Sequence, residues 1–219
     1  MKTISLEHIF MIAMLTAVLY IAGCSKAYYG VMEKVGIHKR DILVDRVEDA
    51  RDAQSEAQEQ FKDALEQFGA VVKIESTDLK EAYETLNAEY EASEKAAENV
   101  SRRIDKVESV AEDLFAEWEK ELQLYKNKAL QRSSAQKLRQ TRSRYQEMLD
   151  SMRKAEKSMT PVLDSFQDNV LFLKHNLNAQ AIGSLRAEFS NLEQGIDSLI
   201  KRMNDAIYRS NKFIDELQQ

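Results

Sequence analysis

The sequence predicts an all-α protein, an elongated antiparallel helical bundle or coiled coil built mostly from four long helices. The 219-residue chain contains one Pro and six Gly, and 31% of its residues are charged. A chain so poor in Gly and Pro, and rich in Ala, Glu, Lys and Gln, favours long helices over sheets. Apolar residues also recur at alternating steps of three and four, which is the coiled-coil period. The formal net charge of −6 argues against a general nucleic-acid binder.

The N-terminal segment has the pattern of a bacterial lipoprotein signal peptide. After Lys2, residues 9–21 are almost wholly apolar. This run is shorter than the ~20 residues that cross a bilayer and suits the apolar region of a secretory signal. The small residues of Ile-Ala-Gly then precede Cys24, so we expect removal of residues 1–23 and lipidation of the Cys24 thiol. A short membrane anchor with an incidental thiol is the alternative, and it needs a longer apolar run.

Lipidation of Cys24 predicts a location in the cell envelope. One acyl chain alone holds a protein only marginally, whereas the several chains of a bacterial lipoprotein anchor it firmly. Ser25 follows the cysteine where Asp marks retention in the inner membrane of many Gram-negative bacteria. This favours the outer membrane, with the body of the protein in the periplasm. Cys24 is the only cysteine, so we expect no disulfide and no cysteine-ligated metal in the mature domain.

The mature chain is expected to begin with the lipidated cysteine and a tether, residues 24–40, followed by one elongated helical coiled-coil domain, residues 41–219. Asp41 is the predicted N-cap of a first helix that ends at about Val72. Its apolar face is thin and is filled by small side chains that allow close helix approach. The face comprises Val44, Val47, Ala50, Ala53, Ala57, Phe61, Ala64, Leu65, Phe68 and Val72.

A second helix is expected from about Leu79, because Asp78 and Glu81 have the spacing of a capping box. Its apolar positions alternate in steps of four and three without a miss. They are Leu79, Tyr83, Leu86, Tyr90, Ser93, Ala97, Val100, Ile104, Val107, Ala111, Leu114 and Trp118.

Between Leu122 and Gln146 the apolar seam thins, and we expect a turn at Ser133–Ser134. One unbroken helix from Leu79 to Leu177 is the alternative, since no Gly or Pro excludes it. The third seam contains Leu138, Tyr145, Leu149, Met152, Met159, Leu163, Phe166, Val170, Leu173 and Leu177. Because Pro161 lies within it, we expect a kink or break near Met159.

The last helix has the clearest seam. Asn176 and Asn178 precede it as expected turn or cap residues. Gly183 and Gly195 fall off the seam and are expected to cost some helix stability. The seam comprises Ile182, Leu185, Phe189, Leu192, Ile196, Leu199, Met203, Ala206, Ser210, Phe213 and Leu217.

Two segments carry a family resemblance. They are YYGVMEKVGIHKRDILVDRVEDARDAQ, residues 28–54, of which Val31 to Arg51 is the most specific part, and FLKHNLNAQAIGSL near the last turn. Here the sequence resembles the bacterial domain of unknown function 2959 family, and the resemblance spans nearly all of the mature chain. It implies a helical envelope lipoprotein. It implies no activity, ligand or catalytic residue.

Residues that could carry catalysis are not grouped in the sequence. Of the three histidines, His8 is expected to be removed with the signal peptide, and His38 and His175 are far apart and have no neighbouring ligand at helical spacing. The paired acids of residues 45–60 are typical of a solvated helix face, and no Gly-rich phosphate loop is present. We therefore expect no enzymatic activity, no cofactor, no metal site and no small-molecule substrate.

One stretch has an unusual charge pattern. Residues 122–146 contain no Asp or Glu, and their seven cations are Lys126, Lys128, Arg132, Lys137, Arg139, Arg142 and Arg144. They form either a solvated helical tip or a contact with anionic phospholipid headgroups or a partner, where each cation contributes about 1 kcal/mol. Because the first helix leaves the anchored end and the second returns, we expect this stretch at the membrane-proximal end.

The tyrosines Tyr83, Tyr90, Tyr125 and Tyr145 lie on or beside the seams, where packing is favoured over a partner-binding stripe. Trp118 is expected to pack at the end of the dense seam. Three functions remain open: a structural or spacer lipoprotein, which we favour; an adaptor or chaperone-like coiled coil that grips another envelope protein; and, last, an enzyme. The oligomeric state is left open.

Overall fold

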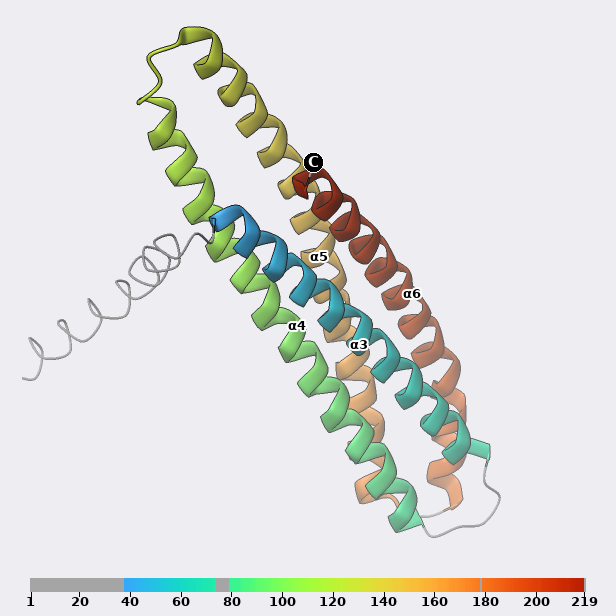
Figure 1. Cartoon of the computed structure of the whole chain (residues 1–219). Helices are drawn as coiled ribbons and strands as arrows, with labels where there is room; N and C mark the ends of the chain where they lie inside the picture. The colour runs from blue at the N-terminus through green and yellow to red at the C-terminus, as the bar shows by residue number, and fades with distance from the viewer. Residues whose placement is uncertain (1–37, 74–78, 178, 219) are drawn as a thin grey trace, which may run out of the picture. The chain divides into compact units, whose positions relative to one another are not determined.

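The computed structural model describes residues 38–73, 79–177 and 179–218, which form four long helices and no strand. These are α3 (Lys39–Lys73), α4 (Leu79–Leu122), α5 (Lys128–His175) and α6 (Ala179–Gln218) (Figure 1). The all-α prediction is thereby confirmed. The predicted signal peptide, Cys24 and most of the tether lie outside the described residues.

The compact unit Leu43–Gln219 is an antiparallel bundle. Its helices alternate in direction, and cross-helix contacts fix their neighbours. Between α3 and α4, Arg103 Nη1 lies 2.9 Å from Asp49 Oδ2. Between α3 and α6, Arg51 Nη1 donates to Asn211 Oδ1 at 3.1 Å. Helix α5 packs between α4 and α6, so the four helices surround one common core.

Aromatic rings fill the core near the end of the unit where α3 ends and α6 begins. Phe68 of α3 lies edge-on to Phe166 of α5, with centroids 6.0 Å apart, and stacks on Phe189 of α6 at 6.1 Å. Tyr90 of α4 completes the layer against Phe166 at 6.2 Å. Side chains from all four helices therefore meet in one layer, which fixes their register.

The seams predicted from the sequence are largely the buried faces. In α6 the residues from Leu192 to Ala206 at seam positions are fully buried, and the alanines of α3 are buried as expected. In α4 the predicted positions from Leu86 to Ala111 are buried except for half-buried Tyr90, whereas Leu79 and Tyr83 are half-buried. After Ala111, Phe115 and Leu122 are buried in place of Leu114 and Trp118. Beyond this level α4 packs on α5, as in the Phe115–Tyr145 contact at 5.3 Å, so its buried face turns toward that helix.

The predicted helix ends need correction. Helix α3 begins at Lys39, and the His38 carbonyl accepts hydrogen bonds from the amides of Asp41 and Ile42 at 2.9 and 3.2 Å. Asp41 therefore lies in the first turn and is not the N-cap. Asn176 is the C-cap of α5, as predicted, and its Nδ2 donates to the Phe172 carbonyl at 2.9 Å. Asp78 and Asn178 lie outside the described residues.

Helix α5 continues through Pro161 without a break, so that part of the prediction is wrong. The ring faces solvent, while the flanking Met159 and Val162 are buried in the bundle. Burial on both sides of the proline offsets the one backbone hydrogen bond that it removes. Leu177, predicted as the last seam residue, lies past the end of the helix and is 49% exposed. None of the described helices has an apolar stretch long enough to cross a membrane.

Candidate functional site

A tight turn joins α4 to α5, so the prediction of two helices rather than one is confirmed. The turn occupies residues 123–127, not Ser133–Ser134. Asn127 is the N-cap of α5, and its Oδ1 accepts hydrogen bonds from the amides of Ala129 and Leu130 at 2.9 and 3.3 Å. A short polar side chain at this position satisfies amides that have no partner within the helix.

Side chains of α5 complete the turn from the other side. Gln131 Nε2 donates to the Leu122 carbonyl at 2.7 Å, which caps the end of α4. Ser134, expected in the turn, lies inside α5, and its Oγ accepts from Trp118 Nε1 at 2.8 Å. These contacts order the end of the hairpin. We call residues 122–132 the tip.

Two of the seven cations of the acid-free stretch pair with acids of neighbouring helices. Arg142 Nη1 lies 2.7 Å from Glu119 Oε1 of α4, and its guanidinium stands over the Phe115 ring, 5.0 Å from the centroid. Arg144 Nη1 lies 3.1 Å from Glu216 Oε2 of α6. These two arginines tie helices together, so the structure separates them from the tip.

The other five cations point into solvent. They are Lys126, Lys128, Arg132, Lys137 and Arg139, all of them exposed. Lys128 Nζ donates to Gln131 Oε1 at 3.1 Å. Within the described ranges none of the five forms an ion pair with an acid. Lys126, Lys128 and Arg132 belong to the tip, whereas Lys137 and Arg139 lie farther along α5.

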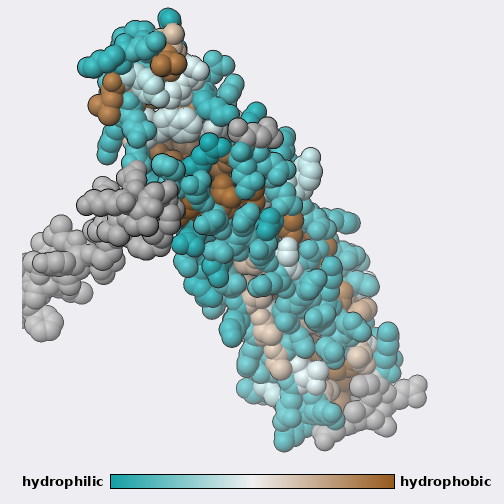
Figure 2. Space-filling model, viewed as in Figure 1, coloured by the Kyte–Doolittle hydropathy of each residue, from teal (hydrophilic) through white to brown (hydrophobic). Residues whose placement is uncertain are grey.

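Exposed apolar side chains accompany the tip cations. Leu124 is 74% exposed, Leu130 57% and Tyr125 37%. Figure 2 shows apolar side chains among hydrophilic ones at this end of the hairpin. Tyr125 was expected to pack on a seam, but it lies in the turn and does not. The sequence reasoning also missed both leucines; the pattern LYKNKAL, which interleaves apolar and basic residues around a capping Asn, could have revealed them.

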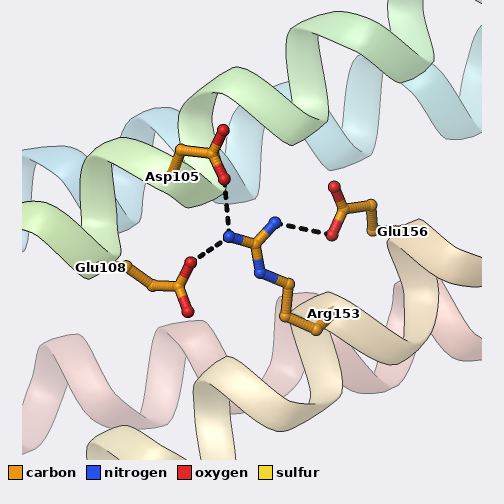
Figure 3. A network of polar contacts seen from close by, with 4 residues as sticks. All are labelled: Asp105, Glu108, Arg153 and Glu156. Atoms are coloured by element: carbon orange, nitrogen blue, oxygen red, sulfur yellow. Dashed lines mark hydrogen bonds and ion pairs between the residues drawn. The ribbon is translucent and has the colours of Figure 1, made fainter.

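A second polar cluster surrounds Arg153 at the α4–α5 contact (Figure 3). Its Nη2 contacts Asp105 Oδ1 at 2.6 Å and also Glu108, while Nη1 contacts Glu156 Oε2 at 2.8 Å. Burial works against the charge of Arg153, but its hydrogen bonds to Glu156, Asp105 and Glu108 outweigh burial and raise its pKa. The cluster is therefore an ion-pair network that holds two helices together.

Tyr145 lies beside this network in the core. Burial, helped by the negative charges of Glu108 and Glu112, raises the pKa of its phenol above the usual value for tyrosine. Across the described residues, no three His, Cys, Asp or Glu side chains are placed so that they could hold a metal ion.

Comparison with known proteins adds a family but no activity. No curated protein matches the chain. The model of the family described as protein of unknown function (DUF2959) matches residues 28–217. This match includes the tip, the Arg153 cluster and nearly all of the four helices. The chain therefore belongs to the family of unknown function DUF2959.

Proposed function

We propose that this protein is a lipid-anchored envelope lipoprotein that acts as a non-catalytic helical spacer, attached to the outer membrane with its helices in the periplasm. The observation that carries the proposal is the length of the packed helices, which contain 35 to 48 residues each. At about 1.5 Å per residue, such helices extend for roughly 50 to 70 Å. A bundle of these helices holds its two ends a fixed distance apart.

The anchoring part of the proposal rests on the sequence. Ile-Ala-Gly precedes Cys24 after an apolar run of signal-peptide length. A lipid on Cys24 would hold the N-terminal end of the chain at a membrane surface. The helices that follow would then extend the chain away from, or along, that surface.

The interior of the bundle favours a structural role over an enzymatic one. Its buried faces are mainly apolar seams, and three acids at the α4–α5 contact, Asp105, Glu108 and Glu156, surround one arginine. Carboxylates neutralised in this way are typical of helix-to-helix ties rather than of a general acid–base pair, which requires two carboxyls facing a shaped cleft.

An adaptor that grips another envelope protein is the second candidate. The exposed Leu124, Tyr125 and Leu130 at the tip favour it, because exposed apolar side chains beside charged ones mark contact surfaces. In this alternative the bundle positions the tip, and the tip binds the other protein.

Metabolic labelling with a fatty-acid probe tests the anchor. The wild-type chain should incorporate the probe and sediment with membranes, whereas Cys24→Ser should do neither. Equal label in the two proteins would refute lipidation at this residue.

In-cell photo-crosslinking from position 124 separates the two roles. A discrete protein adduct, absent when the crosslinker replaces exposed Tyr208 of α6, would favour the adaptor. The spacer predicts no such adduct at either position.

A further inference from the structure

We infer that the tip docks onto the surface of a bilayer that contains anionic phospholipids. In this arrangement Leu124, Tyr125 and Leu130 enter the headgroup region, while Lys126, Lys128 and Arg132 contact the phosphates. The inference rests on the proposed lipoprotein function only for the identity of the membrane. It adds a second membrane contact, separate from Cys24.

The backbone that carries the apolar side chains of the tip is already ordered for this contact. The Asn127 cap and the Gln131–Leu122 hydrogen bond fix the backbone of the turn. Leu124 and Leu130 are mostly in water, and Tyr125 combines an apolar ring with a polar hydroxyl. Leucine and tyrosine of this kind partition into the boundary between headgroups and acyl chains. Little further ordering is required for them to do so.

The charge of the tip is opposite to that of the protein as a whole. Residues 122–132 contain three cations, Lys126, Lys128 and Arg132, and no Asp or Glu, in a chain of net charge −6. Such segregation attracts the tip to an anionic surface, and each cation near that surface strengthens binding about fivefold.

The form of the tip favours a bilayer over a protein partner. A stable protein interface buries about 800 Å² on each side and has an apolar centre. Here two leucines and one tyrosine are interleaved with cations at the end of a two-helix hairpin (Figures 1 and 2). A fluid surface accommodates such a narrow, mixed end without a matching pocket.

The hairpin projects far enough for the tip to make this contact. From the Asp49–Arg103 pair, α4 continues for 19 residues to Leu122, whereas the part of α3 that belongs to the compact unit continues for 6 residues, back to Leu43. At about 1.5 Å per residue the tip stands roughly 20 Å beyond the level of Leu43.

The chain between Cys24 and α3 is long enough for both contacts to share one membrane. Residues 25–38 comprise 14 residues, and a chain of this length spans at most about 50 Å. The lipid on Cys24 and the tip can therefore meet the same bilayer. Joining two contacts in one chain raises the effective concentration of the second, so a weak tip contact suffices.

Vesicle co-sedimentation of residues 25–219, which contain every described helix and lack Cys24, tests the inference. Circular dichroism and a cooperative melt first verify that the protein is folded. We expect binding to vesicles of phosphatidylglycerol and phosphatidylcholine in equal parts, and none to phosphatidylcholine alone. Binding should fade as salt rises from 0.1 M to 1 M, because the Debye length falls from about 10 Å to about 3 Å.

Two tip variants separate the charged from the apolar contribution. Lys126→Gln/Lys128→Gln/Arg132→Gln should weaken binding by about a hundredfold. Leu124→Ser/Leu130→Ser should weaken it at all salt concentrations. The matched control, Lys201→Gln/Arg202→Gln/Lys212→Gln, removes three exposed cations of α6 and should bind like the wild type.

A wild-type protein that stays in the supernatant with anionic vesicles would overturn the inference. So would tip variants that bind as tightly as the control, and a protein adduct at position 124 without vesicle binding would assign the tip to a protein partner. The labelling experiment tests the anchor separately. If the protein does not bind vesicles but Cys24 incorporates the fatty-acid probe, only the docking is refuted. If the protein binds vesicles but Cys24 does not incorporate the probe, only the lipid anchor is refuted.

Discussion

The indole Nε1–H of Trp118 donates a hydrogen bond to Ser134 Oγ across the α4–α5 hairpin, at 2.8 Å. It joins the last turns of α4 to the first turns of α5, where few other side chains are buried. The chain contains one tryptophan, so its fluorescence reports on this part of the hairpin alone.

Ser134→Ala should destabilise the hairpin by about 1 kcal/mol, because Trp118 loses its acceptor. Guanidinium denaturation followed by Trp118 fluorescence measures the change. Ser133→Ala is the matched control, since Ser133 is exposed in the same turn of α5 and both changes gain the higher helix propensity of Ala. Equal midpoints for the two variants would show that the hydrogen bond contributes nothing in solution.

Leu199→Asp should destabilise the bundle by about 3–5 kcal/mol. Leu199 is fully buried, so the substitution places an unpaired charge in the core and removes apolar packing. Arg202→Asp introduces the same residue into the same helix at an exposed position and should cost less than about 1 kcal/mol. Thermal melts followed by circular dichroism compare them, and similar midpoints would contradict the α6 register.

Gln54→Met should stabilise the protein by about 1–2 kcal/mol. Gln54 is fully buried, and in the described part of the chain neither of its amide atoms has a hydrogen-bond partner. A buried amide without hydrogen-bond partners lowers the stability by about 1–3 kcal/mol, and Met fills a similar volume without a group that requires such a partner.

Gln67→Met is the control for this change, because Gln67 is exposed in the same helix and its substitution should shift the stability by less than about 0.5 kcal/mol. Chemical denaturation measures both variants. A Gln54→Met protein no more stable than the wild type would mean that a bound water or a rearranged side chain satisfies the amide.

Arg153→Met should destabilise the protein by about 1–3 kcal/mol, because Asp105, Glu108 and Glu156 lose the cation that they share. Added salt should recover part of the loss by screening the repulsion among the acids. Arg102→Met is the control, since its exposed side chain makes one contact with Glu98, at 3.5 Å. Urea midpoints at low and high salt measure these effects, and equal losses in the two variants would refute a cooperative network.

The helices were predictable because their neighbours impose a period on the sequence. Every position of α6 from Leu192 to Ala206 that faces the core repeats at steps of three and four, since α6 packs on other helices along that length. Such a pattern follows directly from burial, and burial of the apolar face is what stabilises a long helix. Pro161 shows the limit of predicting a break from a single residue, because packing on both sides of the proline outweighs its low helix propensity.

The position of the turn was not predictable from the same pattern. The seam thins because the start of α5 faces α4, as in the Trp118–Ser134 hydrogen bond, whereas the contacts Arg144–Glu216 and Tyr145–Phe213 with α6 lie farther along the helix. A seam that faces one neighbour has fewer apolar residues, so the thinning marked a change of neighbours and not a turn.

The candidate site was predictable in part. The charge pattern alone singled out residues 126–144. Which cations remain unpaired depends on the register between helices, since Arg142 and Arg144 find acids on α4 and on α6. The sequence does not encode that register in any local spacing.

The hairpin end also differs from the bundle in how readily it opens. Its residues pack on one neighbouring helix, whereas those around Phe166 pack on several, so local unfolding there disrupts fewer contacts. Backbone amides near the tip should therefore exchange with deuterium well before those near Phe166, even though both belong to the same two helices. The ordered tip can thus open transiently on its own, while the layers behind it keep their register.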